Sequence, residues 1–192
     1  MARRKDHTRE ELADLAIHCG RELVINEGPA ALTARNVAKK MGYTAGTLYN
    51  LFENIEALIV AINAQTLDSM ARRMAPIFLK KQDPETRIRS LCCEYLKFEQ
   101  DEPQLWKLLF ATPIARESLN EDYHRAAHEV FHPVTETLLP VSGSEEAARQ
   151  DTKIIWSTLH GICLLQQNHK LDVAENDTAE VLVDRFLSNF LH

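Results

Sequence analysis

Residues 33–52 read TARNVAKKMGYTAGTLYNLF, and this stretch decides the fold. Thr33 is a good N-cap, because its hydroxyl can accept a hydrogen bond from an amide of the first helical turn. An apolar pair one turn apart follows, and Gly42 can adopt the left-handed conformation in which helices often end. Thr44 can then cap a second helix. The stretch therefore predicts two short helices joined by a tight turn.

Three residues in this stretch have the sizes that a close crossing of the two helices requires. Ala38 is small enough to let the helices approach, Gly42 makes the corner, and Leu48 fills the angle between them. This combination predicts a helix-turn-helix, whose second helix can lie in the major groove of DNA.

Side chains of the second helix have the chemistry of DNA contacts. Thr47 can touch a thymine methyl group or donate a hydrogen bond, and Asn50 can pair with adenine through two hydrogen bonds. Tyr49 carries a phenolic donor suited to a phosphate oxygen, unless its ring packs inside the protein. The preceding arm holds Arg3 and Arg4, which either enter the minor groove or remain a solvated tail.

The charge distribution agrees with a nucleic-acid partner at the N-terminal end. The 192 residues carry a formal net charge of −6, yet residues 1–52 hold eight Lys and Arg against six Asp and Glu. The N-terminus lacks the apolar run of a secretory signal, and no stretch approaches the length of a membrane span. We therefore expect a cytoplasmic protein whose four cysteines are reduced, small core residues.

Helical periodicity extends over the rest of the chain, without an alternating strand pattern. We predict an all-α fold of about nine helices, with a three-helix head at residues 1–53 and a helical body for effector binding and dimerisation at residues 54–192. Proline is expected to end the fourth helix at Pro76 and to interrupt the seventh at Pro133. The expected helices are 8–27, 33–41, 44–52, 54–74, 84–101, 103–113, 120–139, 144–168 and one from Asn176 or Asp177 to 190, with a turn at 140–143.

The last two helices stay apolar around more than one face, which is typical of helices buried on two sides. In a helical bundle this indicates either a central position or a subunit interface. A two-fold homodimer is the commonest such interface.

The N-terminal part of the chain resembles the TetR family of transcriptional repressors over roughly residues 8–60. This resemblance rests on Gly28 and on four short runs. A second, weaker resemblance lies in Trp156–Gly161, which is similar to a Trp–His–Gly signature of some TetR ligand domains. The four runs are Leu32–Ala38, Met41–Thr44, Gly46–Phe52 and Glu56–Leu58.

The resemblance implies an all-helical homodimer that binds double-stranded DNA and a small-molecule effector. One residue departs from the family pattern, because Ile55 stands where a phosphate-contacting lysine is usual. The residues that the resemblance assigns to phosphates are Thr33, Thr44 and Tyr49, and those toward base edges are Arg35, Ala45, Gly46, Thr47 and Asn50.

A competing motif lies in residues 128–132, where His128-Glu-Val-Phe-His132 fits the zinc-protease pattern H-E-x-x-H. His124 extends it, so that three imidazoles lie one turn apart on one helical face. Pro133 follows directly and removes a helical hydrogen bond. The motif has three interpretations: proteolysis, a regulatory metal site and a solvated histidine face. We predict neither a metal nor a catalytic residue.

Aromatic side chains with a few polar groups are typical of small-molecule sites, and we expect some in the body to line an effector pocket, although helical spacing also fits a core. The candidates are Trp106, Phe110, Trp156, His160 and Cys163.

Together these features predict a homodimeric, ligand-responsive transcriptional repressor that binds a palindromic operator, without a cofactor and without enzymatic activity. Two alternatives remain: a DNA-binding adaptor whose body docks a protein, and a zinc-dependent enzyme using residues 128–132. The sequence identifies neither the effector nor the operator, and does not separate repression from activation.

Overall fold

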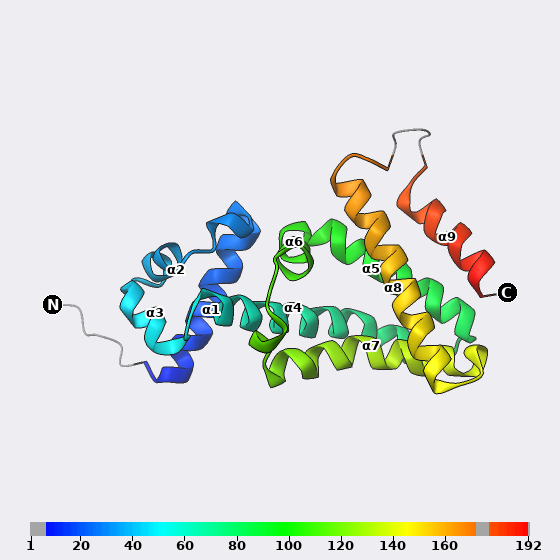
Figure 1. The fold of residues 1–192 in the computed structure, drawn as a ribbon, viewed down its shortest axis with the longest axis horizontal. Coiled ribbons are helices and arrows are strands. Elements are labelled where there is room, and N and C mark those ends of the chain that lie inside the picture. The colour runs from blue at the N-terminus through cyan, green and yellow to red at the C-terminus, as the bar shows by residue number, and fades with distance from the viewer. Residues whose placement is uncertain (1–6, 172–176, 192) are drawn as a thin grey trace. The chain divides into compact units, whose positions relative to one another are not determined.

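The computed structural model describes residues 7–171 and 177–191. These residues form nine α-helices and two short 3₁₀ turns, without a strand among them, so the predicted all-α class is confirmed (Figure 1). The elements are α1 (Arg9–Glu27), η1 (Pro29–Ala31), α2 (Ala34–Met41), α3 (Ala45–Leu51), α4 (Ile55–Phe78), α5 (Pro84–Asp101), α6 (Pro103–Ala111), η2 (Arg116–Ser118), α7 (Glu121–Ser142), α8 (Glu145–Gln167) and α9 (Ala179–Phe190).

The chain divides into two compact units. The first contains residues 1–67 and 102–125, and the second contains residues 68–101 and 126–192. Two helices, α4 and α7, begin in the first unit and end in the second. The predicted functional boundary between residues 53 and 54 stays a prediction. The compact unit that holds the helix-turn-helix is larger than that head.

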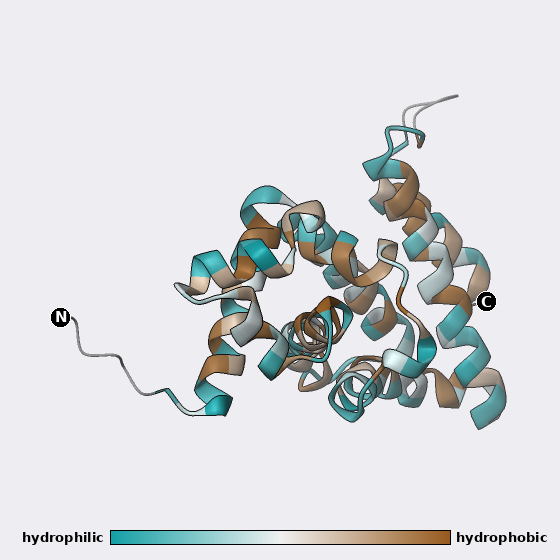
Figure 2. Ribbon diagram, turned by 60° about the vertical axis from the view of Figure 1, so that its left-hand side comes forward, coloured by the Kyte–Doolittle hydropathy of each residue, from teal (hydrophilic) through white to brown (hydrophobic). Residues whose placement is uncertain are grey.

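The core of the first unit explains its larger size. Apolar side chains from α1, α2, α3 and the start of α4 pack with Leu105 and Leu108 of α6. A head of about fifty residues can bury only a small core, so the additional helix adds apolar area that stabilises it. Figure 2 shows hydrophobic and hydrophilic positions alternating around the helices, as amphipathic packing requires.

Helix α1 begins and ends as its sequence predicts. The Thr8 hydroxyl accepts a hydrogen bond from the Glu11 amide, and the Glu11 carboxylate accepts one from the Thr8 amide, which completes a capping box. In the middle of α1, Gly20 lets α4 approach closely. A β-carbon there would lie 2.7 Å from Cδ1 of Ile62.

Proline does not end or interrupt helices where the sequence predicted it. Pro76 lies inside α4, and both Pro133 and Pro140 lie inside α7, which continues to Ser142 through the expected turn. A proline inside a helix costs about 3 kcal/mol. Burial of neighbouring side chains such as Ile77 and Leu138 offsets that cost.

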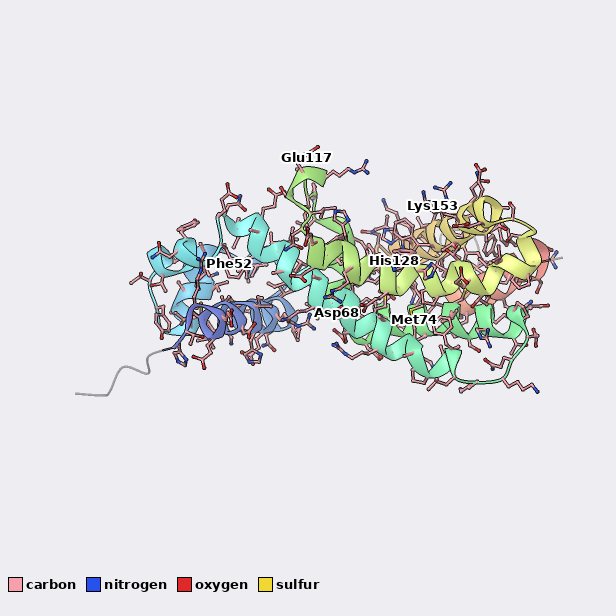
Figure 3. All side chains as sticks on the ribbon, turned by 90° about the horizontal axis from the view of Figure 1, so that it is seen from below. Phe52, Asp68, Met74, Glu117, His128 and Lys153 are labelled. Carbon is pink, nitrogen blue, oxygen red and sulfur yellow. The ribbon has the colours of Figure 1, made fainter. Side chains whose placement is uncertain are left out.

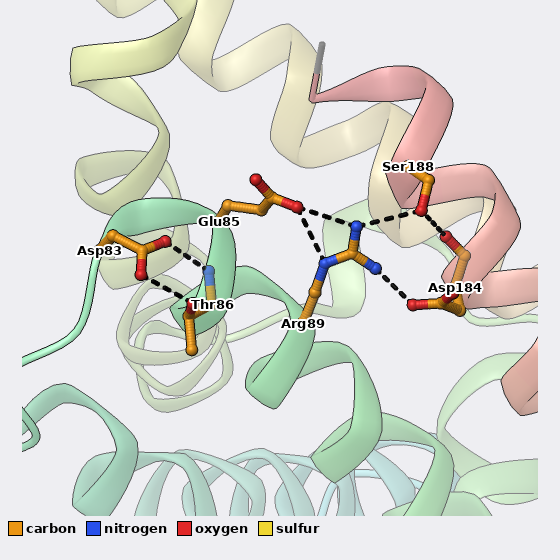
Figure 4. A network of polar contacts seen from close by, with 6 residues as sticks. All are labelled: Asp83, Glu85, Thr86, Arg89, Asp184 and Ser188. Atoms are coloured by element: carbon orange, nitrogen blue, oxygen red, sulfur yellow. Dashed lines mark hydrogen bonds and ion pairs between the residues drawn. The ribbon is translucent and has the colours of Figure 1, made fainter.

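In the second unit, α5, α8 and α9 pack against one another. Arg89 of α5 ties α9 in place, because its guanidinium donates hydrogen bonds to Asp184 and Ser188 as well as to Glu85 (Figure 4). The N-cap of α9 is Thr178 and not Asp177; the alternative cap Asn176 lies outside the described residues. None of the helices in the described ranges combines the length and apolar character that crossing a membrane requires.

Candidate DNA-binding interface and apolar cavity

The corner of α2 and α3 has the predicted geometry. The Thr33 hydroxyl accepts a hydrogen bond from the Asn36 amide at 3.2 Å, and the Thr44 hydroxyl accepts one from the Thr47 amide at 3.3 Å. Gly42 has φ 77°, the left-handed conformation expected between the helices. Leu48 of α3 is buried in the same apolar cluster as Val37 and Met41 of α2. Local capping and this shared apolar packing therefore form the corner, which is a helix-turn-helix.

The residues expected to face DNA lie outside this core. The Tyr49 side chain is 54% exposed, which argues against the alternative that its ring packs inside the protein. Gly46 would accept a β-carbon, since the nearest atom of another residue would be Oγ1 of Thr44 at 3.6 Å. Residues 33, 35, 44, 46, 49 and 50 are exposed, and residues 45 and 47 are half-buried.

One detail of the corner affects the predicted base contact by Thr47. The Thr47 and Thr44 hydroxyl oxygens lie 3.1 Å apart, so one hydroxyl proton is shared between them, and a base contact by Thr47 competes with this pair. The predicted arm of Arg3 and Arg4 lies outside the described residues. Their role in DNA contact stays a prediction.

Ile55 departs from the family pattern for a structural reason. It is half-buried and packs against the apolar core of the first unit, beside residues of α1 and α3. A lysine at this position could not bury the same apolar area, so Ile55 adds to packing where the family pattern has a phosphate contact. The cap beside it is Asn54, as predicted, whose side-chain oxygen accepts a hydrogen bond from the Ala57 amide at 2.8 Å.

An apolar cavity of about 50 Å³ lies within the second unit, between side chains of α4, α5, α7 and α8. Its wall includes Met70 and Met74 from α4, and Figure 3 labels Met74 on that helix. Sequence reasoning missed most of this wall, because residues at helical spacing read as ordinary core. The lining residues are Met70, Met74, Ile88, Leu91, Cys92, Tyr95, Val130, Phe131, Val134, Thr152, Ile155, Trp156 and Leu159.

Of the five residues predicted for an effector pocket, Trp156 lines this cavity. Next to it, Nδ1 of His160 lies 3.2 Å from the hydroxyl oxygen of Tyr95. Burial lowers the pKa of the His160 imidazole. Cys163 is buried deeper in α8. Trp106 and Phe110 lie together in α6 of the first unit, with ring centroids 5.3 Å apart.

The histidines and the glutamate of the H-E-x-x-H motif lie on the exposed face of α7, whereas Val130 and Phe131 between them line the cavity. The rings of His128 and His132 stack with centroids 4.6 Å apart, and Glu129 is exposed beside them (Figure 3 labels His128). Within the described ranges there is no group of three or more His, Cys, Asp or Glu side chains that could hold a metal ion.

Two sequence families match the chain. Residues 88–190 match the family described as "Tetracyclin repressor-like, C-terminal domain". Residues 17–62, which contain the helix-turn-helix, match "Bacterial regulatory proteins, tetR family". The chain belongs to the TetR family. TetR-family proteins are DNA-binding regulators and not enzymes, so the zinc-enzyme alternative was wrong, and this chain is a DNA-binding transcription regulator.

Solved structures of low identity share the TetR fold. A protein with unknown function from Rhodococcus sp. RHA1 has TM-score 0.76 and 16% identity, covering 98% of this chain and 97% of that chain. Thermus thermophilus FadR in complex with lauroyl-CoA has TM-score 0.66, 17% identity and 93% coverage of both chains. Bacillus subtilis FadR in complex with stearoyl-CoA has TM-score 0.66 and 14% identity, covering 93% and 97%. No curated protein matches the chain.

Proposed function

We propose that this TetR-family protein is a homodimeric cytoplasmic repressor that binds a palindromic operator and releases it when a small molecule fills the cavity of the second unit. One observation carries the proposal. Helix α4 starts three residues after Phe52, the C-cap of the recognition helix, and further along contributes Met70 and Met74 to the cavity wall. The same helix therefore adjoins the DNA-reading corner and the cavity.

On the DNA side, α3 would enter the major groove. Arg35, Thr47 and Asn50 would face base edges, with Ala45 and Gly46 close to the bases, while Thr33, Thr44 and Tyr49 would hold phosphates. Six of these eight residues are exposed and Ala45 and Thr47 are half-buried, which supports their contact with DNA. Base contacts discriminate between sequences, whereas phosphate contacts set the position of the protein on the duplex.

The homodimer is supported by apolar side chains that α8 and α9 leave exposed. Ile154 on α8 is 46% exposed and Val181 on α9 is 55% exposed, and Leu164 and Leu165 of α8 are exposed as well. These side chains belong to two helices that pack against each other, and exposed apolar surface on such helices can form an interaction site. A second copy covering them would give a two-fold dimer, whose recognition helices reach half-sites about 34–36 Å apart.

The size of the cavity supports a coupling between effector and DNA. At about 50 Å³ it is smaller than the roughly 150 Å³ of an engineered cavity that binds benzene. An effector must therefore enlarge it by displacing lining side chains, of which the flexible methionines of α4 move most easily. Binding would then favour a different position of α4, and hence a different position of the α2–α3 corner that precedes α4 in the chain. Such couplings are typically about 1–3 kcal/mol.

Relatives of the same fold support an effector with a large apolar part. The structures of FadR from Thermus thermophilus and Bacillus subtilis hold lauroyl-CoA and stearoyl-CoA. A cavity lined mainly by methionine, leucine, isoleucine and aromatic side chains suits the same general chemistry in this chain.

Selection of bound fragments from genomic DNA tests the proposal. The full-length protein is incubated with fragmented DNA, and the enriched sequences are aligned. We expect a palindrome bound by two copies, and loss of enrichment in a variant with both Arg35→Ala and Tyr49→Ala, two exposed positions whose replacement leaves the core intact. Recovery of no enriched sequence, or of a site occupied by one copy, would overturn the proposed operator recognition.

A further inference from the structure

The side chains that line the cavity carry few polar groups, all of them uncharged, and two of their hydroxyls are already bonded inside the protein. The Tyr95 hydroxyl contacts His160, and the Thr152 hydroxyl donates to the Ala148 carbonyl at 2.8 Å. Burial raises the pKa of the Cys92 thiol to about 12, so the thiol stays protonated at neutral pH. The lining residues include no Lys, Arg, Asp, Glu or His.

One arginine next to the cavity wall is held by carboxylates. Arg73 lies between the lining residues Met70 and Met74 of α4. Its Nε lies 2.6 Å from Oε1 of Glu94, and its Nη2 lies 2.7 Å from Oδ2 of Asp101. Both acidic residues belong to α5, so Arg73 is turned toward that helix.

A second arginine is held in the same way. Arg89 follows the lining residue Ile88 on α5, and its guanidinium bonds Glu85, Asp184 and Ser188 (Figure 4). For either arginine to neutralise a ligand anion, it would have to leave two carboxylates without their counter-ion. Glu94 and Glu85 are partly buried, whereas Asp101 and Asp184 are exposed. A ligand anion would therefore compete with carboxylates that already pair both guanidinium groups, and the partly buried carboxylates lose most when their pair is broken.

We infer that the effector of this cavity is as a whole an uncharged, predominantly apolar molecule whose polar atoms are limited to hydroxyl, ether, carbonyl or ester groups. The inference rests on the proposed function, in which this cavity holds the effector. A buried charge needs a paired partner, and the cavity supplies none, whereas a single neutral polar atom can share a hydrogen bond with the hydroxyl of Tyr95 or Thr152.

This ligand class differs from the acyl-CoA molecules that the FadR structures hold. A coenzyme A group carries several phosphate charges, which would need lysine or arginine near the cavity. Lys153 is exposed on α8 directly after the lining residue Thr152, so it is a candidate cation for such a group (Figure 3). The experiment therefore includes this residue.

Three probes with the same ten-carbon chain separate the ligand classes: 1-decanol, decanoate and decanoyl-CoA, each below its micelle concentration at pH 7.5. Binding to the full-length protein is followed by tryptophan emission. Trp156 lines the cavity and Trp106 belongs to the other unit, so a Trp156→Phe variant identifies the part of the signal that comes from the cavity. We expect saturable binding of 1-decanol, with at least about tenfold weaker binding of both anions.

A pair of variants on α7 places the binding in the cavity. Val134 is half-buried in the lining, and Val141 is exposed on the same helix outside it. Val134→Phe fills space in the cavity and should weaken 1-decanol binding, whereas Val141→Phe should leave it unchanged. Should Val134→Phe fail to fold, the difference between the wild-type protein and Trp156→Phe localises the probe by itself.

Three outcomes would overturn the inference. They are no cavity signal with 1-decanol, binding of decanoate or decanoyl-CoA as tight as that of 1-decanol, and decanoyl-CoA binding that Lys153→Ala weakens by tenfold or more. The proposed function fails separately. If 1-decanol fills the cavity without affecting operator binding, the ligand class holds and the switch does not, whereas release of DNA by tightly bound decanoyl-CoA supports the switch and refutes the ligand class.

Discussion

A β-carbon added to Gly46 would lie 3.6 Å from the hydroxyl oxygen of Thr44, an ordinary van der Waals distance. The fold therefore does not require glycine at this position. Gly46 lies on the exposed face of α3, where the proposed interface brings the helix closest to DNA. In the proposed interface, its lack of a side chain leaves room for DNA next to the helix.

Gly46→Ala should separate folding from DNA binding. We expect the free energy of unfolding to stay equal or to rise by up to about 1 kcal/mol, because alanine favours helix more than glycine does. Operator affinity should fall about tenfold or more, a loss of about 1.4 kcal/mol, because the new methyl group occupies space next to the bases. Urea unfolding and fluorescence anisotropy measure the two quantities, and unchanged affinity would contradict the proposed approach of α3.

Tyr49 and Asn50 should differ in the kind of loss that their replacement causes. Tyr49→Phe removes a phosphate donor, so it should weaken binding by a similar factor on every sequence and change the preference at none. Asn50→Ala should change the preference at one base pair, by about 1–3 kcal/mol. Binding to a panel of single-base operator variants measures both, and a uniform loss for the two variants would refute the assignment of roles.

The close approach of α1 and α4 at Gly20 predicts a rescue. Gly20→Ala should destabilise the protein by about 1–3 kcal/mol, because its methyl group would lie 2.7 Å from Cδ1 of the buried Ile62. Ile62→Val removes that atom and alone costs about 0.5–1.5 kcal/mol. In a double-mutant cycle of unfolding free energies, the two changes together should cost at least about 0.5 kcal/mol less than their sum. Additive costs would mean that the contact is absent.

Two buried polar residues of α4 should respond to apolar replacement in opposite directions. Neither polar atom of the Asn63 side chain has a hydrogen-bond partner among the described residues, although the residue has no exposed surface. Asn63→Leu should therefore raise the free energy of unfolding by about 1–3 kcal/mol.

Thr66 provides the matched control for Asn63. Its hydroxyl accepts a hydrogen bond from Arg21 at 2.8 Å and donates one to the Ile62 carbonyl at 2.9 Å. Thr66→Val removes both bonds and should lower the free energy of unfolding by about 1–2 kcal/mol. If Asn63→Leu is as destabilising as Thr66→Val, the Asn63 amide is bonded in the native protein.

The helix-turn-helix could be predicted from the sequence because its signals are local. Caps at Thr33 and Thr44, a left-handed Gly42 and buried Leu48 all act within twenty residues, and each has the predicted geometry. The first helix was predictable for the same reason, from the capping box that begins at Thr8.

Features that depend on tertiary packing could not be predicted in this way. Pro76 and Pro133 have strong local tendencies to end helices, but burial around them outweighs the lost hydrogen bond. At Ile55 the sequence indicated only the loss of a lysine, because the packing of Ile55 against the core of the first unit depends on tertiary structure. The cavity wall could not be predicted from the sequence, because Met74 and Ile155 have the same helical spacing as residues with no cavity beside them.

Operator affinity with the cavity filled tests the central claim most directly. The dissociation constant for the selected palindrome is measured by anisotropy without a ligand and again with a molecule that saturates the Trp156 emission change, beginning with 1-decanol. We predict that filling the cavity weakens operator binding by a factor of about 5 to 150, and that the operator weakens ligand binding by the same factor. An operator affinity that stays unchanged while Trp156 reports a filled cavity would contradict the account.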